Sequence, residues 1–175
     1  MCGISGIVNI DNKFDFPYKS LNKMNSEVNH RGPDGEGIFV KKNVGFGHTR
    51  LSIIDLSSKG NQPMHYRDRY TITYNGEIYN YIELRSKLVD QGYEFISDTD
   101  TEVILASYDF WGNKCVNKFN GMWAFAIYDN QSEIIFLSRD RFGIKPLYYA
   151  SFKDKFIFGS EIKQLLQFSG RKPNL

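Results

Sequence analysis

Residues 1–10 read MCGISGIVNI, and this stretch decides how the rest of the chain is interpreted. The alternate positions from Ile4 to Ile10 share one parity, which predicts a β-strand with one buried face. A cysteine, Cys2, directly follows Met1, although free cysteines are usually buried or reactive and chain ends usually fray. The stretch therefore predicts a strand anchored in the fold, with a thiol that needs an explanation at its start.

The composition is that of a chain with one sizeable core and little net charge. Of its 175 residues 41% are apolar, and the formal net charge is +2. No basic run is interleaved with aromatic residues, and no stretch approaches the ~20 apolar residues of a membrane span. Ser5 and Asn9 interrupt the apolar start, so no signal peptide is expected. With only Cys2 and Cys115, the latter expected to pack inertly, we expect a cytoplasmic protein without nucleic-acid or membrane partners.

The pattern further along the chain predicts antiparallel runs of strands and separate blocks of helices. Helical spacing is present over 21–28 and 78–89, the pair Thr99 and Glu102 predicts a helix that starts near Asp100, and a last helix begins near Glu161. The expected strands are 36–40, 44–54 and 69–74, followed by two hairpins, 122–129 with 133–140 and 147–151 with 155–159. This order favours an α+β fold over βαβ repeats.

Cys2 has two readings, a small buried residue at a strand start or an N-terminal nucleophile. Removal of Met1 would give Cys2 both a thiol and the α-amino group of the chain. The amine has an ordinary pKa near 8 and the thiol one near 8.5, so one residue would supply a nucleophile and a nearly matched base. Retention of Met1 would leave the amine on the wrong residue, and the protein would then be inactive.

A nucleophile that attacks a carbonyl needs donors for the developing oxyanion, and the stretch YNGEIYN offers two. Asn75 can donate through its side-chain amide, and Gly76 can donate its backbone N–H without a Cβ in the way. The alternative is an Asn-Gly hairpin turn. Because the residues that follow have helical spacing, we expect the dipeptide to lie between the end of a strand and the start of a helix.

Three charged residues are candidates for binding a substrate that is itself an α-amino acid. Arg50 lies in an apolar stretch and can hold a carboxylate with two parallel hydrogen bonds, although it can equally lie on an exposed face. Asp100 and Glu77 can each receive an ammonium group, and Asp100 can alternatively stabilise a helix N-terminus. His48 could instead pair with Cys2 in an ordinary Cys–His dyad. Arg50, Asp100 and Glu77 could bind the charged groups of an α-amino acid, while Cys2, Asn75 and Gly76 could act on a side-chain amide. The predicted substrate is therefore an amino acid with a side-chain amide, and glutamine fits.

These motifs carry a resemblance to a known family. The stretches MCGISGIV, RGPDGEG, GHTRLSIIDLS, YNGEIYNYIELR, SDTDTEVIL, FNGMWAFAIYD and SRDRFGIKPLYY resemble the glutaminase domain of glutamine-hydrolysing asparagine synthetase. That domain is a member of the class II, N-terminal-nucleophile glutamine amidotransferases. The resemblance covers nearly the whole chain in order, and it implies a four-layer αββα sandwich of two antiparallel sheets.

The resemblance also implies roles for individual residues. Cys2 would attack the glutamine side-chain amide through a thioester, and Asn75 and Gly76 would form the oxyanion hole. The residues implied to bind glutamine are Arg50, Leu51, Ser52, Ile53, Ile54, Asn75, Gly76, Glu77 and Asp100. The products would be glutamate and ammonia, and no metal or other cofactor is expected in this domain.

Members of this family pass ammonia to a second synthetase domain that uses ATP. Asparagine as the final product is implied only by the resemblance to the asparagine-synthetase branch of the family. No Ser-Gly-Gly pyrophosphate loop occurs here, so we expect residues 2–175 to be the glutaminase domain, with the question of its last elements open. ATP and magnesium would belong to the synthetase domain, in the same chain or a separate one. The alternatives are a non-catalytic domain that binds glutamine or docks a partner through SRDRFGIKPLYY, and an amide or peptide hydrolase with another substrate.

Overall fold

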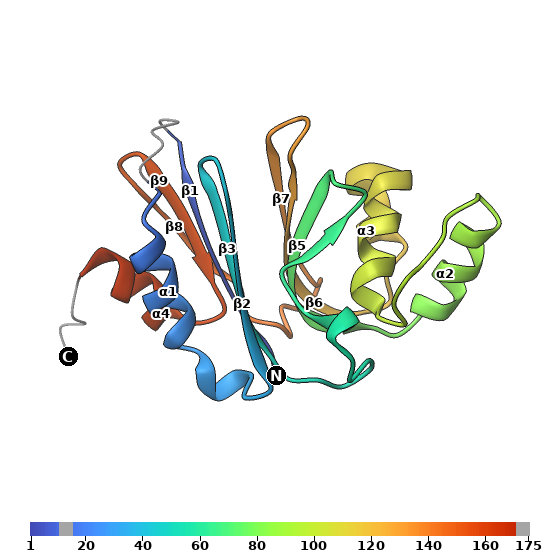
Figure 1. Cartoon of the computed structure of the whole chain (residues 1–175), viewed down its shortest axis with the longest axis horizontal. Coiled ribbons are helices and arrows are strands. Elements are labelled where there is room, and N and C mark those ends of the chain that lie inside the picture. Colours follow the sequence, from blue (N-terminus) through green and yellow to red (C-terminus); the bar gives the residue numbers. More distant parts are fainter. Residues whose placement is uncertain (11–15, 171–175) are drawn as a thin grey trace.

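Two antiparallel β-sheets form the centre of the computed structural model, which describes residues 1–10 and 16–170 (Figure 1). The first sheet has the strand order β2-β3-β1-β9-β8 and the second has the order β4-β5-β6-β7. The strands are β1 (Gly3–Asn9), β2 (Gly35–Lys41), β3 (Val44–Arg50), β4 (Met64–Tyr66), β5 (Tyr70–Ile78), β6 (Gly121–Asp129), β7 (Ile134–Arg139), β8 (Tyr148–Phe152) and β9 (Lys155–Gly159). The helices are α1 (Tyr18–Ser26), α2 (Tyr81–Val89), α3 (Asp100–Trp111) and α4 (Ile162–Ser169), with 3-10 turns η1 (Asn29–Arg31), η2 (Ser58–Gly60) and η3 (Gly112–Asn117).

Helices cover the outer face of each sheet, so the molecule has four layers. Figure 1 shows α1 and α4 on one side of the paired sheets and α3 and α2 on the other. Apolar side chains fill each of the three interfaces: Leu21 of α1 packs against the first sheet, Phe46 lies between the two sheets, and Ile104 of α3 packs against the second sheet. The expected α+β sandwich of two antiparallel sheets is therefore confirmed.

β1 is the central strand of the first sheet, and both of its faces are buried. Ile4 lies in the cluster between the two sheets, whereas Ile7 lies in the cluster under α1 and α4. The prediction of a single buried face was wrong because a strand in a four-layer sandwich is covered on both sides. Ile10 lies beyond the end of the strand and is exposed.

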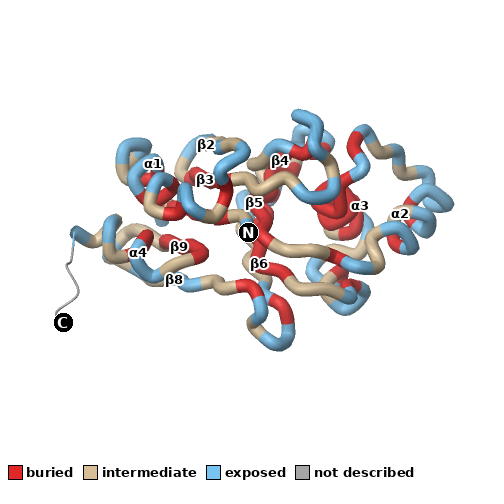
Figure 2. The backbone as a smooth tube through the Cα atoms, turned by 90° about the horizontal axis from the view of Figure 1, so that it is seen from below, coloured by how far each residue is buried: buried red, intermediate tan, exposed pale blue. Residues whose placement is uncertain are grey.

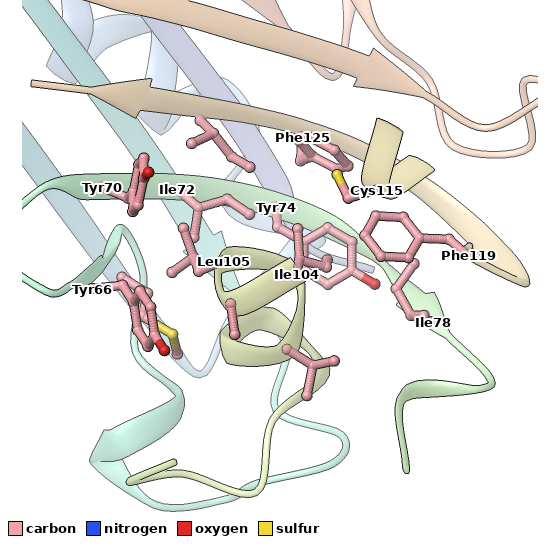
Figure 3. Close-up of a cluster of buried hydrophobic side chains, with 14 of the residues drawn as sticks. Tyr66, Tyr70, Ile72, Tyr74, Ile78, Ile104, Leu105, Cys115, Phe119 and Phe125 are labelled. Carbon is pink, nitrogen blue, oxygen red and sulfur yellow. The ribbon is translucent and has the colours of Figure 1, made fainter. Parts of the chain in front are cut away.

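The third interface, between the second sheet and α3, holds the largest apolar cluster. Figure 3 shows rings of Tyr70, Tyr74 and Phe119 gathered with aliphatic side chains of β5 and α3. Cys115 is fully buried in this cluster, and burial raises the pKa of its thiol to about 12. The expectation that Cys115 packs inertly is confirmed, because a thiol without thiolate character is a poor nucleophile.

The N-terminus of α3 is capped as expected, with one difference. The Thr99 side chain accepts a hydrogen bond from the Glu102 backbone N–H at 3.2 Å. The Glu102 carboxylate, however, accepts from the backbone N–H groups of Ile96 and Ser97 instead of completing a capping box. Both bonds still fix the loop that leads into α3, and Asp100 is the first residue of the helix as predicted.

Two predicted boundaries were wrong. The strand expected over 44–54 ends at Arg50, because its partners on either side, Gly35 of β2 and Gly3 of β1, are the last residues available for pairing. The helix expected from 78 begins at Tyr81, because β5 continues to Ile78, which pairs with Gly121 of β6. The spacing of apolar residues does not show where a strand loses its neighbouring strands or where it continues to pair with them.

The N-terminus lies within the described residues, whereas the C-terminus does not. The N-terminus lies where the two sheets meet, beside β5 and β6 (Figure 2). The expectation that the domain extends to 175 concerns residues 171–175, which lie outside the described residues. Among residues 1–10 and 16–170, none of the helices combines the length and apolar content that a bilayer crossing requires.

Candidate active site

A cavity of about 460 Å³, counting its open mouth, lies at the end of the molecule where β1 begins. Its walls are Cys2, Arg50, Leu51, Ser52, Ile53, Ile54, Asp55, Gly60, Gln62, Tyr74, Gly76, Thr99, Asp100 and Thr101. Of the candidate site residues singled out from the sequence, the cavity brings together all except His48, Asn75 and Glu77.

The thiol of Cys2 is held against the backbone of the loop that follows β3. The Leu51 N–H donates to Sγ at 3.3 Å, and Sγ lies 3.5 Å from the Leu51 carbonyl oxygen, to which the thiol can donate. Burial raises the pKa of the Cys2 thiol, while the Leu51 backbone and the positive charges of Arg50 and Lys145 act in the opposite direction. With Met1 in place the thiol is therefore mostly protonated at neutral pH, and nucleophilic attack requires a base.

Asn75 and Gly76 lie inside β5, which continues to Ile78, so the expected placement between the end of a strand and the start of a helix was wrong, and the alternative of a hairpin turn is excluded. Asn75 pairs with Ala124 of β6, and Gly76 pairs with Trp123. A Cβ at Gly76 would collide with the Met122 carbonyl oxygen, so the tight approach of β6 requires glycine here.

The edge of β5 beyond β4 presents backbone donors to the cavity. The Tyr74 N–H donates to Gln62 Oε1 at 2.7 Å, and the Ile78 N–H donates to Asp100 Oδ2 at 2.9 Å. Alternate residues of a strand direct their N–H groups to the same side. The Gly76 N–H, between these two, is thus directed to the same edge, where Gly76 lines the cavity.

Asn75 projects from β5 on the side opposite to Tyr74 and is nearly inaccessible, with 2% of its surface exposed. Its Nδ2 is buried and has no acceptor among the described residues. A buried amide donor without an acceptor costs about 1–3 kcal/mol. Such a donor is expected at a functional site that supplies the acceptor only when a substrate is bound.

Arg50, the last residue of β3, organises the loop that forms one wall of the cavity. Its Nη1 donates to the Ser57 carbonyl at 2.9 Å and to Asn61 Oδ1 at 2.7 Å, and its Nη2 donates to the Asp55 carbonyl. Gly60 makes this possible, because a Cβ there would collide with Nη2. A guanidinium has five N–H donors, so two remain for a ligand carboxylate.

The segment that follows Arg50 forms the wall through its backbone and not as a strand. The Ser52 N–H donates to Asp34 Oδ2 at 2.8 Å, which ties the loop to the turn before β2. Ile53 and Ile54 are exposed even though their residue type favours strands. Both residues line the cavity.

Asp100 supplies the negative charge of the cavity. Its Oδ2 accepts hydrogen bonds from the Tyr74 hydroxyl at 2.7 Å and from the Ile78 N–H at 2.9 Å. Burial raises the pKa of Asp100, and these two hydrogen bonds partly offset that effect. Arg50 and Asp100 thus place opposite charges in one cavity with Cys2, an arrangement that matches the two charged groups of a free α-amino acid.

Two other candidates lie outside the cavity wall. Glu77 follows Gly76 on β5, and its negative charge contributes to the raised pKa of Asp100. His48 is fully buried, and its Nε2 lies 3.1 Å from the Tyr74 carbonyl oxygen. Burial lowers the pKa of His48 to about 4, so its ring is neutral and Nε2 donates to that carbonyl. The structure therefore forms no Cys2–His48 dyad.

Several wall residues were missed from the sequence. Gln62 reaches both the Tyr74 N–H and, at 3.4 Å, the Thr101 hydroxyl, so it connects β5 to α3 across the cavity. Gly60 and Asp55 position Arg50. The only available signal was their place in a polar, glycine-containing connection between two predicted strands, which is typical of any surface loop.

Comparison with known proteins gives consistent results. The family model described as "Glutamine amidotransferase domain" matches residues 1–175. The chain is 46% identical to putative asparagine synthetase [glutamine-hydrolyzing] 2 of Methanocaldococcus jannaschii, over 95% of this chain and 35% of that protein. It is 45% identical to asparagine synthetase [glutamine-hydrolyzing] 1 of Bacillus subtilis, over 95% of this chain and 27% of that protein. The chain thus spans about a third or less of the length of these relatives.

A solved structure supports the fold independently. The chain superimposes on the glutamine phosphoribosylpyrophosphate amidotransferase from B. subtilis with a TM-score of 0.79 over 95% of this chain and 43% of that chain. Sequence identity in this superposition is 20%, so the similarity concerns the fold. It confirms the two antiparallel sheets and flanking helices that the sequence predicted.

Proposed function

The chain belongs to the glutamine amidotransferase domain family, and from this membership and the geometry of its cavity we propose that it hydrolyses glutamine through Cys2. The observation that carries the proposal is the cavity itself. It holds a thiol, a free pair of guanidinium donors, a carboxylate and a strand edge with a backbone donor. Together these match the amide, carboxylate and ammonium groups of one amino acid.

The proposed reaction starts after Met1 is removed. The Cys2 thiol attacks the side-chain carbonyl carbon of glutamine, and its proton passes to the freed α-amine of Cys2 through a bridging water. The carbonyl oxygen becomes an oxyanion, which accepts hydrogen bonds from Asn75 Nδ2 and the Gly76 N–H. The C–N bond then breaks, and the proton held by the amine goes to the leaving ammonia. Water cleaves the remaining thioester, which yields glutamate and restores the thiol.

Substrate recognition follows from the same geometry. Arg50 would bind the glutamine carboxylate with its two remaining donors, while Asp100, assisted by Glu77, would receive the ammonium group. The backbone of Leu51, Ser52, Ile53 and Ile54 would line the substrate along the wall. The proposed reaction uses protein groups, glutamine and water, and it requires no metal or other cofactor in this domain.

The fate of ammonia is the second part of the proposal. The relatives are described as glutamine-hydrolysing asparagine synthetases and are about three times as long or more. We infer that ammonia goes to a synthetase domain, in the same chain or a separate one, which binds ATP and magnesium and amidates aspartate or a related acid. The connection after β7 and the start of β8 offer a docking surface for that domain. Phe142 and Ile144 of the connection and Tyr149 of β8 are exposed apolar residues, and Phe142 is 89% exposed.

A non-catalytic glutamine-binding domain is the second candidate, because a Cys2 whose nitrogen stays bonded to Met1 has no free amine to act as the base. Intact mass spectrometry distinguishes the two at once, since catalysis requires a mass lower by one methionine. The decisive assay is glutamate release from glutamine by wild type and Cys2→Ala. We expect turnover in wild type alone, and equal rates would refute the proposed function. Protection of Cys2 from alkylation by glutamine would distinguish a glutaminase from a hydrolase with another substrate.

A further inference from the structure

Lys145 is a buried lysine whose role the proposed reaction leaves unexplained. Only 6% of its surface is exposed, although lysine is among the residues least often buried. It forms no ion pair with a carboxylate among the described residues. Its Nζ instead lies 3.2 Å from Sδ of Met1. The buried charge therefore faces the one residue that must leave before Cys2 can act.

The position of Lys145 is fixed by a rigid turn between β7 and β8. The Asp140 carboxylate accepts hydrogen bonds from the backbone N–H groups of Trp123, Phe142, Ile144 and Lys145, at 2.9 to 3.2 Å. Although burial alone would raise the pKa of Asp140, these bonds together hold it below its usual range. A carboxylate with four backbone donors is a specific device for shaping a turn.

The carbonyl side of Lys145 is held as well. The Arg139 guanidinium donates through Nε to the Lys145 carbonyl at 2.7 Å and through Nη2 to the Gly143 carbonyl at 2.6 Å. In Figures 1 and 2 this connection crosses from the second sheet to the first beside the N-terminus. The fold thus holds the Lys145 backbone from both sides, at the place where the chain begins.

We propose that Lys145 is a positioning residue of the glutaminase reaction, whose ammonium group increases the fraction of the freed Cys2 α-amine that is unprotonated at neutral pH. The inference rests on the proposed function, because only an N-terminal nucleophile uses its amine as the base. A protonated amine cannot accept the thiol proton, so the fraction of neutral amine limits the rate. A fixed positive charge nearby disfavours a second positive charge, and it favours the thiolate at the same time.

Distance and charge set the expected size of the effect. Five bonds separate Met1 Sδ from the nitrogen of Cys2, a span of no more than about 6 Å. The Lys145 Nζ therefore lies within about 9 Å of the future amine, and a charge at that range in partly buried surroundings changes proton affinity about tenfold. At pH 7 an amine with an ordinary pKa near 8 is roughly 10% neutral, and tenfold weaker proton binding makes it about half neutral.

The other charged groups around Cys2 cannot replace Lys145. Arg50, the second cation that acts on the thiol, is bonded to its loop and reserved for the substrate carboxylate. The remaining ionisable groups near this end of the fold are His48, which is neutral, Asp55 and Asp100 in the cavity wall, Tyr74 and Glu77 of β5, Asp140, which is occupied by its turn, and Glu161, which is bonded to His30, Arg31 and Lys163. Lys145 is the cation that faces the position of Met1.

The test compares Lys145→Met, which keeps the length of the side chain and removes its charge, with Lys145→Arg, which keeps the charge. Lys114→Met, at an exposed position of η3, is the control for a general change in net charge. Each protein is first shown by intact mass to lack Met1. The first readout is the α-amine pKa, measured from the pH dependence of N-terminal acetylation followed by peptide mapping. The second is the pH profile of kcat/KM for glutamine.

We expect Lys145→Met to raise the amine pKa by about one unit, to move the acidic limb of kcat/KM upward by the same amount and to reduce the rate at pH 7 about fivefold. The rate should recover near pH 9, and Lys145→Arg and Lys114→Met should resemble wild type. An unchanged amine pKa in Lys145→Met, or a rate loss equal at all pH values, would overturn the inference. The amine titration needs no turnover and works in Cys2→Ala. Failure of this inference is therefore distinguishable from failure of the proposed function.

Discussion

Asn75→Ala separates the oxyanion role of Asn75 from a structural one, because the structure predicts a large loss of activity and only a small change in stability. The amide Nδ2 has no acceptor among the described residues, so truncation breaks no N–H bond from that group. It removes instead a buried, unsatisfied donor, whose burial costs about 1–3 kcal/mol. The loss of packed side-chain volume offsets this gain by a similar amount, at roughly 24 cal/mol per Å³ of cavity. The net change in unfolding free energy should stay within about 1 kcal/mol.

The effect on turnover should be much larger. Removal of one oxyanion donor typically lowers kcat by about 10²–10³, or roughly 3–4 kcal/mol of transition-state stabilisation. KM for glutamine should change little, since the donor acts on charge that develops only during reaction. The assay is glutamate release under saturating glutamine, alongside thermal unfolding. For a domain of this size 1 kcal/mol corresponds to about 2–4 °C in Tm, so the Tm should move by no more than that.

Asn25→Ala is the matched control, because Asn25 is an equally buried asparagine with its amide groups occupied. Its Oδ1 accepts from the Ser5 hydroxyl at 3.3 Å, and its Nδ2 donates to the His48 carbonyl at 3.4 Å. Loss of both bonds leaves partners unsatisfied and should cost about 2–4 kcal/mol, with a smaller loss of kcat. If Asn75→Ala lost less than threefold in kcat, or lowered Tm more than Asn25→Ala, the assignment of Asn75 as an oxyanion donor would be refuted.

Three further changes test other parts of the site and the fold. Gly60→Ala should displace the Arg50 guanidinium and raise KM for glutamine about tenfold with a smaller change in kcat, measured by steady-state kinetics. Because burial raises the pKa of Asp100, wild-type KM should rise as pH falls through that pKa and protonation removes the charge that binds ammonium, whereas Asp100→Asn should have a high KM without this pH dependence. Two hydrogen bonds from Arg69 to Asp129 hold the pKa of this carboxyl well below its usual range, so their stabilisation is complete above about pH 4 and is lost as pH falls further. Asp129→Asn should flatten the acidic limb of unfolding free energy against pH, measured with urea.

Two of these tests have a matched control in the chain. Gly35→Ala should leave KM unchanged, because the nearest atom to a Cβ there is 4.0 Å away. Lys42→Met removes an ion pair that is exposed on both sides and screened by solvent, so it should leave the acidic limb unchanged. A normal KM in Gly60→Ala, a pH-dependent KM in Asp100→Asn, or an unaltered acidic limb in Asp129→Asn would each contradict the corresponding reasoning.

The sequence predicted most strands because their signals are local. Both hairpins, the start of α3 at Asp100 and the last helix follow from side-chain period and capping residues, which depend only on neighbours in the chain. The errors occurred where a distant partner decides the outcome. Ile78 extends β5 because β6 offers Gly121 for pairing, and 51–54 leaves the sheet because neither β1 nor β2 reaches it.

By itself the sequence determined which chemistry is present: a thiol one residue from the chain start, amide and backbone donors at Asn75 and Gly76, and charges at Arg50 and Asp100. Residue types carry that information, since each has fixed donors, acceptors and charge. Only the tertiary structure decided how they act together. Placing Asn75 in a strand, leaving its amide without an acceptor, and directing the Lys145 ammonium toward Met1 all depend on contacts between residues far apart in sequence. Such contacts are set by how sheets and turns pack, and no local pattern encodes them.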